Sequence, residues 1–483
     1  MELFQGINYK ILNKGKEVEY TGIEYDSRKI KNNNIFFALE GKNFDGHKYI
    51  KMAIENGAKM IVVSKELEIL HKDISYIEVE DTRKIMGQVA SNFYNKPEKK
   101  IKIIGVTGTN GKTTSTYILE SLLGKVARIG TVEYKVGDEV FEAVNTTPES
   151  LDIIKIIDLA LKKNIEYLVM EVSSHALEMA RVDMLDFDVA VFTNLSQDHL
   201  DYHENMEKYF LAKRKLFLKL KDKRKSVINI DDNNGKILSN EFKGISYGEK
   251  AILSGKVLEY NLSHMKIELT YKGDTYVKNV KLMGLFNLYN IMGAVGGALQ
   301  LGFEFKNICD KLENLSAVPG RFQIVEAGQN YMVVVDYAHT PDGLKNILLA
   351  LDSIKKTRII TVFGAGGDRD KTKRPLMALE ASKYSDYIIL TSDNPRTENP
   401  KLILDDVEKG LENSNVFYEK QVNREEAIKR AIEIAKKDDI ILIAGKGHET
   451  YQIIANEKIH FDDREIAKKY ILENKLQEVL ICF

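Results

Sequence analysis

The chain is poor in the residues and segments that mark secreted and membrane proteins. Its 483 residues include two cysteines, seven prolines and no tryptophan. Cys309 and Cys482 lie far apart in sequence, which argues against a disulfide framework and fits a reducing cytoplasm. The N-terminus has no basic region followed by an apolar segment, and no apolar run approaches the roughly 18 residues of a membrane span. We therefore expect a cytoplasmic protein with no signal peptide and no membrane insertion.

An excess of charge of either sign is also missing. The chain has 70 lysines and arginines against 71 aspartates and glutamates, which gives a formal net charge of −1. This balance argues against a protein that binds nucleic acid or a membrane surface along its whole length. The segment 213–225 is locally basic, but without a basic chain around it we interpret it as a solvated helix face, with Lys213 as an exception.

Short apolar strands alternate with helix-length segments along the chain, which predicts an α/β fold with mainly parallel sheets. At about 150 residues per domain, the length indicates three domains. The polar stretch 94–100 resembles a linker, and the alternation starts again after Pro319-Gly320-Arg321. We expect domains at 1–97, 98–320 and 321–483. The clearest predicted strands of the first hundred residues are 35–39 and 60–63. Further strands are expected near 101–107, 167–172, 188–193, 226–230, 332–336, 358–363, 386–391 and 439–443.

The segment 105–114 has the pattern of a phosphate-binding loop. It reads Gly-Val-Thr-Gly-Thr-Asn-Gly-Lys-Thr-Thr and directly follows an apolar run. Gly108 and Gly111 allow backbone N–H groups to approach phosphate oxygens, and Lys112 adds a positive charge. The strict P-loop spacing would place a glycine at position 106, where this chain has Val106. The loop is therefore a variant of the common pattern.

Two further strand ends carry polar groups suited to a metal ion. Glu171 ends the first of these strands and could hold Mg²⁺, although the residues after it could equally form a helix N-cap. At the second, four potential ligands occur within six positions and favour a metal site over a plain polar loop: Asp198, His199, Asp201 and His203. Hard oxygen ligands near a phosphate loop favour Mg²⁺.

Taken in order, the motifs resemble those of the Mur ligases over essentially the whole chain. These are cytoplasmic ATP-dependent enzymes that add amino acids to the UDP-linked peptidoglycan precursor. The resemblance is strongest to the members that add the third residue of the peptide. It implies an N-terminal α/β UDP-binding domain, a central ATPase domain and a C-terminal Rossmann-like domain. The motifs begin at positions 26, 41, 107, 171, 194, 212, 284, 319, 335, 366, 393 and 445.

The resemblance implies roles for individual residues around the nucleotide. Catalysis is assigned to Lys112, Glu171, His199 and Lys213, with Lys213 carbamylated by CO₂ so that it becomes a metal-binding carboxylate. Thr113, Glu171, His199 and the modified Lys213 would hold Mg²⁺. The residues implied to bind ATP are Gly108, Thr109, Asn110, Gly111, Lys112, Thr113, Thr114, Asn287, Asn290, Arg321 and Asp336.

The other two substrates are assigned by the same resemblance. The UDP-MurNAc-dipeptide would contact Ser27, Asn145, Thr146, Thr147, Ser173 and Arg181. The added amino acid would contact Arg369, Asp393, Asn394, Pro395, Arg396, Gly445 and Glu449. The chain departs from some relatives at Met179 and at 42–44, where one precursor contact and the uridine contacts would differ.

The implied reaction joins an amine to the D-glutamate carboxylate of UDP-MurNAc-L-Ala-D-Glu through an acyl phosphate formed from ATP. Arg369 and Arg396 offer two grips for carboxylates, and Glu449 can accept an ammonium, which suits a diamino diacid. Meso-diaminopimelate fits this pattern, and lanthionine presents the same two ends. L-lysine remains an alternative, as does a ligase resembling folylpolyglutamate synthetase. A P-loop switch without ligase activity would not need Glu171, His199 and Lys213. We expect a monomer with no nucleic-acid partner.

Overall fold

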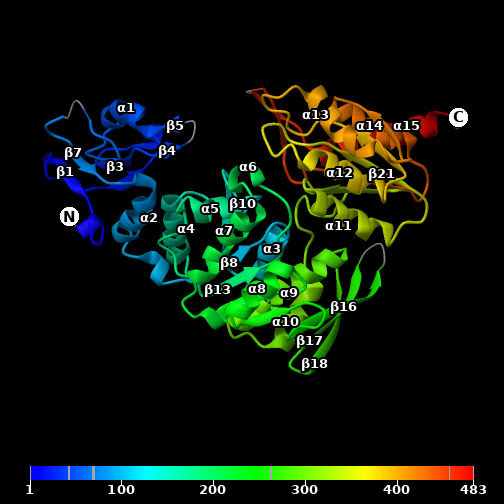
Figure 1. The fold of residues 1–483 in the computed structure, drawn as a ribbon, viewed down its shortest axis with the longest axis horizontal. Helices are drawn as coiled ribbons and strands as arrows, with labels where there is room; N and C mark the ends of the chain where they lie inside the picture. The colour runs from blue at the N-terminus through cyan, green and yellow to red at the C-terminus, as the bar shows by residue number, and fades with distance from the viewer. Residues whose placement is uncertain (1, 42–43, 68–70, 261–263, 456, 482–483) are drawn as a thin grey trace. The chain divides into compact units, whose positions relative to one another are not determined.

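The computed structural model describes residues 2–41, 44–67, 71–260, 264–455 and 457–481. The chain divides into two compact units. Figure 1 shows the helices and strands of both. Unit 1 comprises residues 1–105, 125–188 and 215–222, and unit 2 comprises residues 106–124, 189–214 and 223–483. The chain passes from one unit to the other within strand β8 (Lys102–Thr107) and within helix α7 (Met206–Leu218).

Unit 1 begins with a five-stranded sheet in the order β1-β7-β6-β3-β2. All residues of β3 and β6 are buried, as expected for parallel strands covered on both faces. Strand β1 is antiparallel to β7, and the remaining neighbours are parallel. The elements are β1 (Lys10–Asn13), β2 (Gly22–Glu24), β3 (Asn34–Phe37), β4 (Glu40–Gly41), β5 (Phe44–Asp45), α1 (Ile50–Glu55), β6 (Met60–Val63), β7 (Ser75–Glu78) and α2 (Thr82–Phe93).

The rest of unit 1 contains four strands in the order β11-β10-β9-β12. Strand β12 is parallel to β9, and it ends at Glu171, as the sequence predicts. Helix α4 places its apolar side on the core of the N-terminal sheet through Leu151 and Ile154. The elements are β9 (Ala127–Ile129), β10 (Glu133–Val136), β11 (Glu139–Glu142), α4 (Ser150–Lys162), β12 (Tyr167–Glu171) and α5 (Ser174–Glu178).

The first part of unit 2 surrounds helix α9 (Leu285–Gln300). This helix is apolar on almost all sides and packs against α3 and strands β13 to β16, as expected of a fully buried helix. Strands β13, β14 and β15 are parallel, while β16, β17 and β18 form an antiparallel meander. The other elements are α3 (Lys112–Leu123), β13 (Val189–Phe192), α6 (Leu200–His203), β14 (Ser226–Asn229), α8 (Asn233–Glu241), β15 (Ile245–Tyr247), β16 (Leu253–Tyr260), β17 (Met265–Tyr271), β18 (Asp274–Val280) and α10 (Phe305–Lys311).

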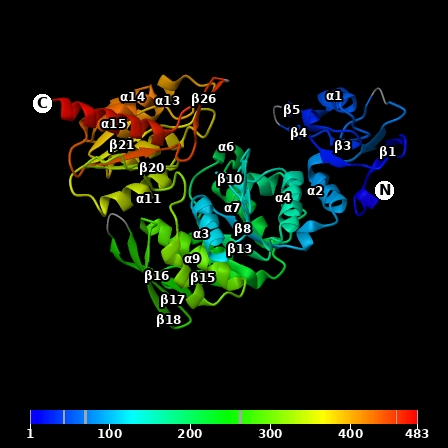
Figure 2. The same cartoon turned by 180° about the vertical axis from the view of Figure 1, so that it is seen from behind.

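The second part of unit 2 is a six-stranded sheet in the order β19-β20-β24-β21-β22-β23. All neighbours are parallel except β19, and helices cover both faces, with α11 on one side and α14 on the other (Figures 1 and 2). The elements are β19 (Gln323–Ile324), β20 (Met332–Asp336), α11 (Pro341–Asp352), β21 (Ile359–Phe363), α12 (Lys373–Ser382), β22 (Tyr387–Leu390), α13 (Pro400–Glu408), β23 (Phe417–Lys420), α14 (Arg424–Ile434), β24 (Ile440–Ala444), β25 (Tyr451–Ile454), β26 (Glu457–His460) and α15 (Asp463–Ile481).

The α/β fold with large, mainly parallel sheets is confirmed. The structure differs from the sequence analysis in two local features. The stretch 94–100 is packed within unit 1, because Glu98 is buried and accepts a hydrogen bond from Ser91 Oγ at 2.9 Å. The β16–β18 meander was not predicted, although Lys272-Gly273 between two alternating segments has the positive φ angles of a hairpin turn. Across the residues described, no helix is both long and apolar enough to cross a membrane.

A buried ion pair fixes the loops at the carboxyl ends of β22 and β24. Arg424 and Asp463 are both inaccessible to solvent, and the guanidinium donates to both carboxylate oxygens at 2.8 and 2.7 Å. Arg424 also donates to the carbonyl oxygens of Ser392 at 3.3 Å and Ala444 at 3.0 Å. One side chain therefore connects two strand ends with the first turn of α15.

Arg424→Met is expected to lower the free energy of unfolding by about 3 to 5 kcal/mol, because it leaves the Asp463 carboxylate buried without its partner. Urea unfolding of the intact chain measures the loss. The double variant Arg424→Met/Asp463→Asn removes both charges and should recover part of it. A single variant as stable as the unmodified chain would contradict this account of the ion pair.

Candidate active site

The loop after β8 needs glycine at two positions. Gly108 has a φ of +149°, and a Cβ there would lie 1.9 Å from Thr193 Oγ1. Gly111 has a φ of +88°, and its Cβ would lie 2.2 Å from Asn290 Oδ1. Any side chain at either position would displace the loop, so both glycines are required by close packing as well as by backbone conformation.

Hydrogen bonds fix the conformation of this loop just before α3. The backbone N–H of Thr109 donates to the Asn194 carbonyl oxygen at 2.9 Å, and that of Asn110 donates to Asn194 Oδ1 at 2.9 Å. Lys112 is the first residue of α3, and its ammonium donates to the carbonyl oxygens of Gly108 and Thr109 at 3.0 and 2.8 Å. A helix N-terminus combined with a lysine at the same place is suited to bind phosphate oxygens.

Lys213 reaches the same loop from helix α7. Its side chain is fully buried, its Nζ lies 2.7 Å from the Gly108 carbonyl oxygen, and it lies 4.3 Å from the centre of the Tyr209 ring. Burial, and then the charge of Lys112, lower the pKa of Lys213 well below its usual value. These surroundings favour a neutral amine at this position.

Asp198 forms a different set of contacts from those expected of a four-residue metal cluster. Its Oδ1 accepts a hydrogen bond from Lys373 Nζ at 3.2 Å, and its Oδ2 lies 3.3 Å from His199 Nε2 and 3.9 Å from His339 Nε2. Asp201 is exposed, and His203 is buried beside Tyr209. Of the expected cluster of Asp198, His199, Asp201 and His203, only the first two lie together, and the ammonium of Lys373 pairs with the Asp198 carboxylate.

A cavity of about 540 Å³ opens beside the loop within unit 2. Arg321 projects into it, donates to Thr113 Oγ1 at 3.0 Å and stacks 4.6 Å from the centre of the Tyr337 ring. Asp336 accepts hydrogen bonds from the backbone N–H groups of Phe322 at 2.7 Å and Ala338 at 2.8 Å. The predicted residues that line the cavity are Asn110, Gly111, Thr114, Asn290, Arg321 and Asp336.

Sequence reasoning missed the aromatic wall of this cavity. Tyr247, Phe286 and Tyr289 line it, and Tyr289 donates a hydrogen bond to Asp231 at 2.7 Å. Phe286 and Tyr289 lie close to Asn290 in sequence, on α9, which was the available signal; Tyr247 ends β15 and offered none. Asn287 is buried instead, because its Nδ2 donates to the Met283 carbonyl oxygen at 2.7 Å and its Oδ1 accepts from Asn290 at 3.0 Å.

The residues predicted to contact the added amino acid lie on loops at the carboxyl ends of β21, β22 and β24. A Cβ placed on Gly366 would lie 3.1 Å from Arg396 Nη1 and 3.7 Å from Arg369 Cγ, so the two arginines flank this glycine. Burial, and then the charge of Arg369, lower the pKa of Arg396. Two neighbouring guanidinium groups on a partly buried surface form a site for anions.

The other side of this site is acidic. Glu449 Oε2 accepts hydrogen bonds from Asn394 Nδ2 and Lys446 Nζ, each at 2.9 Å. Gly445 has a φ of +117°, and a Cβ there would lie 2.6 Å from Asp393 Oδ2. Asp393, Asn394, Gly445 and Glu449 are therefore brought together, and Pro395 connects them to Arg396.

The residues predicted to contact the precursor lie in unit 1. Glu171, which was predicted to hold Mg²⁺, lies in the same unit and accepts hydrogen bonds from the backbone N–H of Thr131 at 2.8 Å and from its hydroxyl at 3.0 Å. Thr147 Oγ1 donates to the Glu171 carbonyl oxygen at 2.8 Å and accepts from the Ser173 N–H at 3.1 Å. Arg181 donates to the Thr147 carbonyl oxygen at 2.9 Å.

The remaining precursor residues occupy two places in unit 1. The Asn145 carbonyl oxygen accepts from Tyr134 at 2.6 Å, and the Thr146 hydroxyl lies 3.1 Å from that of Thr131. Ser27 lines a separate cavity of about 460 Å³, where Phe44 and Tyr49 stack with ring centres 5.5 Å apart. Residues 42 and 43, which were expected beside it, lie outside the described residues.

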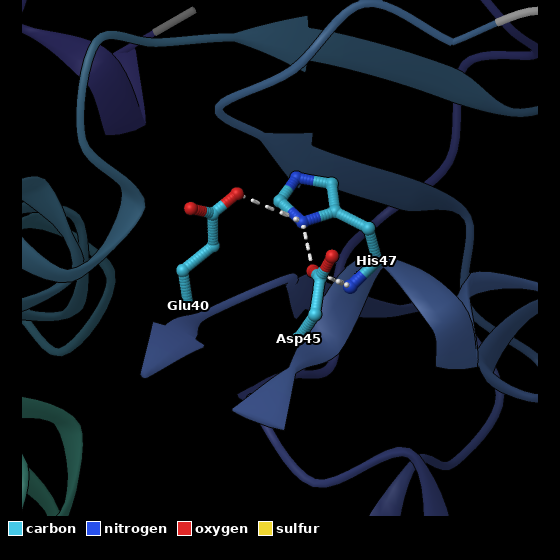
Figure 3. A group of neighbouring side chains, drawn as sticks. All are labelled: Glu40, Asp45 and His47. Carbon is cyan, nitrogen blue, oxygen red and sulfur yellow. Dashed lines mark hydrogen bonds and ion pairs between the residues drawn. The ribbon is translucent and has the colours of Figure 1, made fainter. Parts of the chain in front are cut away.

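Glu40, Asp45 and His47 form the one metal-like group found within the described part of the chain (Figure 3). His47 Nδ1 lies 2.8 Å from Asp45 Oδ1, and its Nε2 accepts from the Ser64 N–H at 3.2 Å. Lys65 forms ion pairs with Glu40 at 2.6 Å and Asp45 at 3.1 Å. Both ring nitrogens are engaged and one ammonium pairs with both carboxylates, so we interpret this group as an ion-pair network.

Family models match three successive parts of the chain. Residues 19–94 match the catalytic domain of the Mur ligase family, residues 106–298 match the Mur ligase middle domain, and residues 320–447 match the Mur ligase glutamate ligase domain. A UDP-N-acetylmuramoyl-L-alanyl-D-glutamate–2,6-diaminopimelate ligase of Fusobacterium nucleatum is 56% identical, with 99% of each chain covered. The ligase of the same name from Caldanaerobacter subterraneus is 45% identical, covering 98% of this chain and 99% of the relative.

Solved structures give the same result at lower identity. A structure of a UDP-N-acetylmuramoyl-L-alanyl-D-glutamate–2,6-diaminopimelate ligase is 34% identical, with a TM-score of 0.64 and coverage of 94% of this chain and 95% of that one. MurF ligase from Thermotoga maritima in complex with ADP shares the fold at 19% identity, with a TM-score of 0.68 and coverage of 93% and 96%. From its sequence and its fold alike, the chain belongs to the Mur ligase family.

Proposed function

We propose that this chain adds 2,6-diaminopimelate to the D-glutamate of UDP-MurNAc-L-Ala-D-Glu, with ATP as the activating substrate. An ATP-dependent ligase of peptidoglycan synthesis is the function that the family and its near relatives support. The observation that carries the choice of amino acid is the proximity of Arg369 and Arg396, with the carboxylate of Glu449 near enough to Arg396 for their charges to interact. Two guanidinium groups and a carboxylate complement an amino acid with two acidic ends and an extra ammonium.

The loop residues would hold the phosphates of ATP. Lys112 can exchange its hydrogen bonds to Gly108 and Thr109 for bonds to phosphate oxygens, and Arg321 lies at the Thr113 hydroxyl beside the cavity. The precursor carboxylate must approach a phosphate of the same charge to form the acyl phosphate. Lys112 and Arg321 reduce this repulsion and orient the phosphate for attack.

The site also fits a carbamate on Lys213 and Mg²⁺. A fully buried ammonium next to Lys112 is electrostatically unfavourable, and a neutral Lys213 amine can react with CO₂. The resulting carbamate would be an oxygen ligand of Mg²⁺. The Thr113 hydroxyl and His199, which belong to the same unit, would be further ligands. Glu171 belongs to unit 1, and its role as a ligand stays a prediction. When bound, Mg²⁺ would neutralise phosphate charge.

The second step needs the amine of the incoming amino acid. Arg396 would hold one carboxylate and Arg369 the other, while Glu449 would accept the ammonium at the end that does not react. This grip would orient the reacting amine toward the acyl phosphate and favour attack by the amine over attack by water. Lanthionine has the same two ends and would meet the same three residues.

Two alternatives differ in the substrate they need. L-lysine has one carboxylate and would leave one of the two arginines without a partner. A folylpolyglutamate synthase of Mycobacterium tuberculosis shares the fold with a TM-score of 0.61 at 15% identity, but it covers 81% of this chain. Three further expectations belong to the proposal: a cytoplasmic location, a monomeric state and domains at 1–97, 98–320 and 321–483.

The proposal is tested by phosphate release from ATP with Mg²⁺ and UDP-MurNAc-L-Ala-D-Glu. Diaminopimelate, lanthionine and L-lysine are compared in parallel, and release with diaminopimelate is expected. No release with any of the three would reject the ligase function of this chain. Turnover with L-lysine alone would reject the two-carboxylate site while leaving the ligase function in place.

Arg396→Ala is expected to raise the KM for diaminopimelate about 10- to 100-fold, because a charged hydrogen bond to a carboxylate is worth about 1.5 to 3 kcal/mol. Steady-state kinetics measure the KM for diaminopimelate and the KM for ATP, and the latter should stay unchanged. Arg430→Ala is the matched control, since Arg430 pairs with Glu419 on an exposed part of the same domain. An equal rise in both KM values would contradict an amino-acid-binding role.

Lys213→Ala is expected to abolish phosphate release, and added short carboxylates should restore part of it by replacing the carbamate. Removal of CO₂ should lower the activity of the unmodified chain. Lys208→Ala, an exposed change on the same helix, serves as the control. Full activity of Lys213→Ala would exclude the carbamate.

A further inference from the structure

Lys446 is a buried cation whose place in the reaction is unassigned. It follows β24 by two residues, and its side chain has no solvent exposure. Its ammonium donates to Glu449 Oε2 at 2.9 Å and to Asn394 Oδ1 at 3.3 Å, and it lies 5.4 Å from the centre of the Tyr451 ring. An ammonium removed from water is costly unless it is paired, so these contacts account for its burial.

Both hydrogen-bond acceptors of Lys446, Asn394 and Glu449, belong to the proposed amino-acid site. Asn394 donates to the same Glu449 oxygen at 2.9 Å, so one oxygen, Oε2, receives both donors. Within the described residues, neither donor reaches Oε1, and the side chain of Glu449 is 14% exposed. Oε1 is thereby left for a ligand, and its direction is set by the two bonds on the other oxygen.

We propose that Lys446 is a positioning residue that holds Oε2 of Glu449 and directs the other oxygen toward the ammonium of the incoming diamino acid. The inference rests on the proposed function, because it takes Glu449 to be the group that recognises this ammonium. Lys446 itself is inaccessible to solvent, whereas Glu449 is partly exposed, so Lys446 would act through the carboxylate. Its removal should therefore change how the amino acid binds and leave the phosphate-binding loop as it is.

The charges around Glu449 explain why such a partner is needed. Burial, and then the nearby carboxylate of Asp393, raise the pKa of Glu449, while the hydrogen bonds from Lys446 and Asn394 oppose the rise. The other charged or titratable groups that face Glu449 are Arg396, Arg424 and Tyr337. A carboxyl with a raised pKa loses its charge as the pH falls through that pKa, so recognition of an ammonium weakens on the acidic side.

The test is the pH dependence of kcat/KM for diaminopimelate in Lys446→Met, a neutral side chain of similar length. Without the ammonium, the pKa of Glu449 rises further, and the acidic limb of the profile should move up by about 1 to 2 pH units. The KM for diaminopimelate should rise most at acidic pH and return toward the unmodified value at alkaline pH. Loss of packing alone would raise it equally at every pH.

Glu449→Gln provides the matched control. This variant cannot ionise, so adding Lys446→Met to it should produce no further shift of the acidic limb. A shift of the same size in the Glu449→Gln background, or an unshifted profile in Lys446→Met, would overturn the inference. Lys446→Gln is the second variant if Lys446→Met fails to fold, and the same shift is expected from it.

The failure of this inference is distinguishable from the failure of the proposed function. If the unmodified chain releases no phosphate with any of the three amino acids, the function itself is rejected. If the unmodified chain uses diaminopimelate and Lys446→Met keeps its profile, only the role of Lys446 is rejected. The KM for ATP, measured in the same assays, shows whether the phosphate loop has remained intact.

Discussion

The carbonyl oxygen of Gly108 is the point on which the nucleotide site depends. Lys112 and Lys213 both donate to it, from the start of α3 and from α7, although like charges in a buried place repel each other. The arrangement becomes favourable when phosphate draws Lys112 away or when Lys213 loses its charge. The loop therefore brings together the two amines for which we propose different roles, and the absence of a side chain at Gly108 leaves its backbone open to both.

In the six-stranded sheet, too, glycine backbone lies close to charged side chains, here at the proposed amino-acid site. Parallel strands bring their carboxyl ends to one edge, and the loops that follow β21, β22 and β24 carry Arg369, Arg396 and Glu449. Gly366 leaves room for the two arginines, and Gly445 leaves room for Asp393. Behind them, Arg424 connects two of the loops to α15, so the geometry of the site is fixed by buried charge.

Much of this arrangement could be predicted because strands and motifs are local in sequence. The strand ending at Glu171, the helix starting at Lys112 and the parallel order of the main strands follow from apolar runs and glycine turns. Ion pairs between residues far apart in sequence could not be predicted from such local patterns. Asp198 pairs with Lys373, which is 175 residues away, and the spacing of the residues around Asp198 gave no sign of this ammonium. The β16–β18 meander was missed because its strands are antiparallel and interrupt the βα alternation.

The division of labour in unit 2 has an evolutionary consequence. The side chains proposed to recognise the amino acid lie on three loops of one sheet, while the loop proposed to bind phosphate and Lys213 belong to other elements. Substitutions in those three loops could therefore change which amine is accepted without altering how a carboxylate is activated. A scaffold built in this way can diversify its building blocks, and with them the chemistry of a cell wall, while its energy-coupling machinery is inherited unchanged.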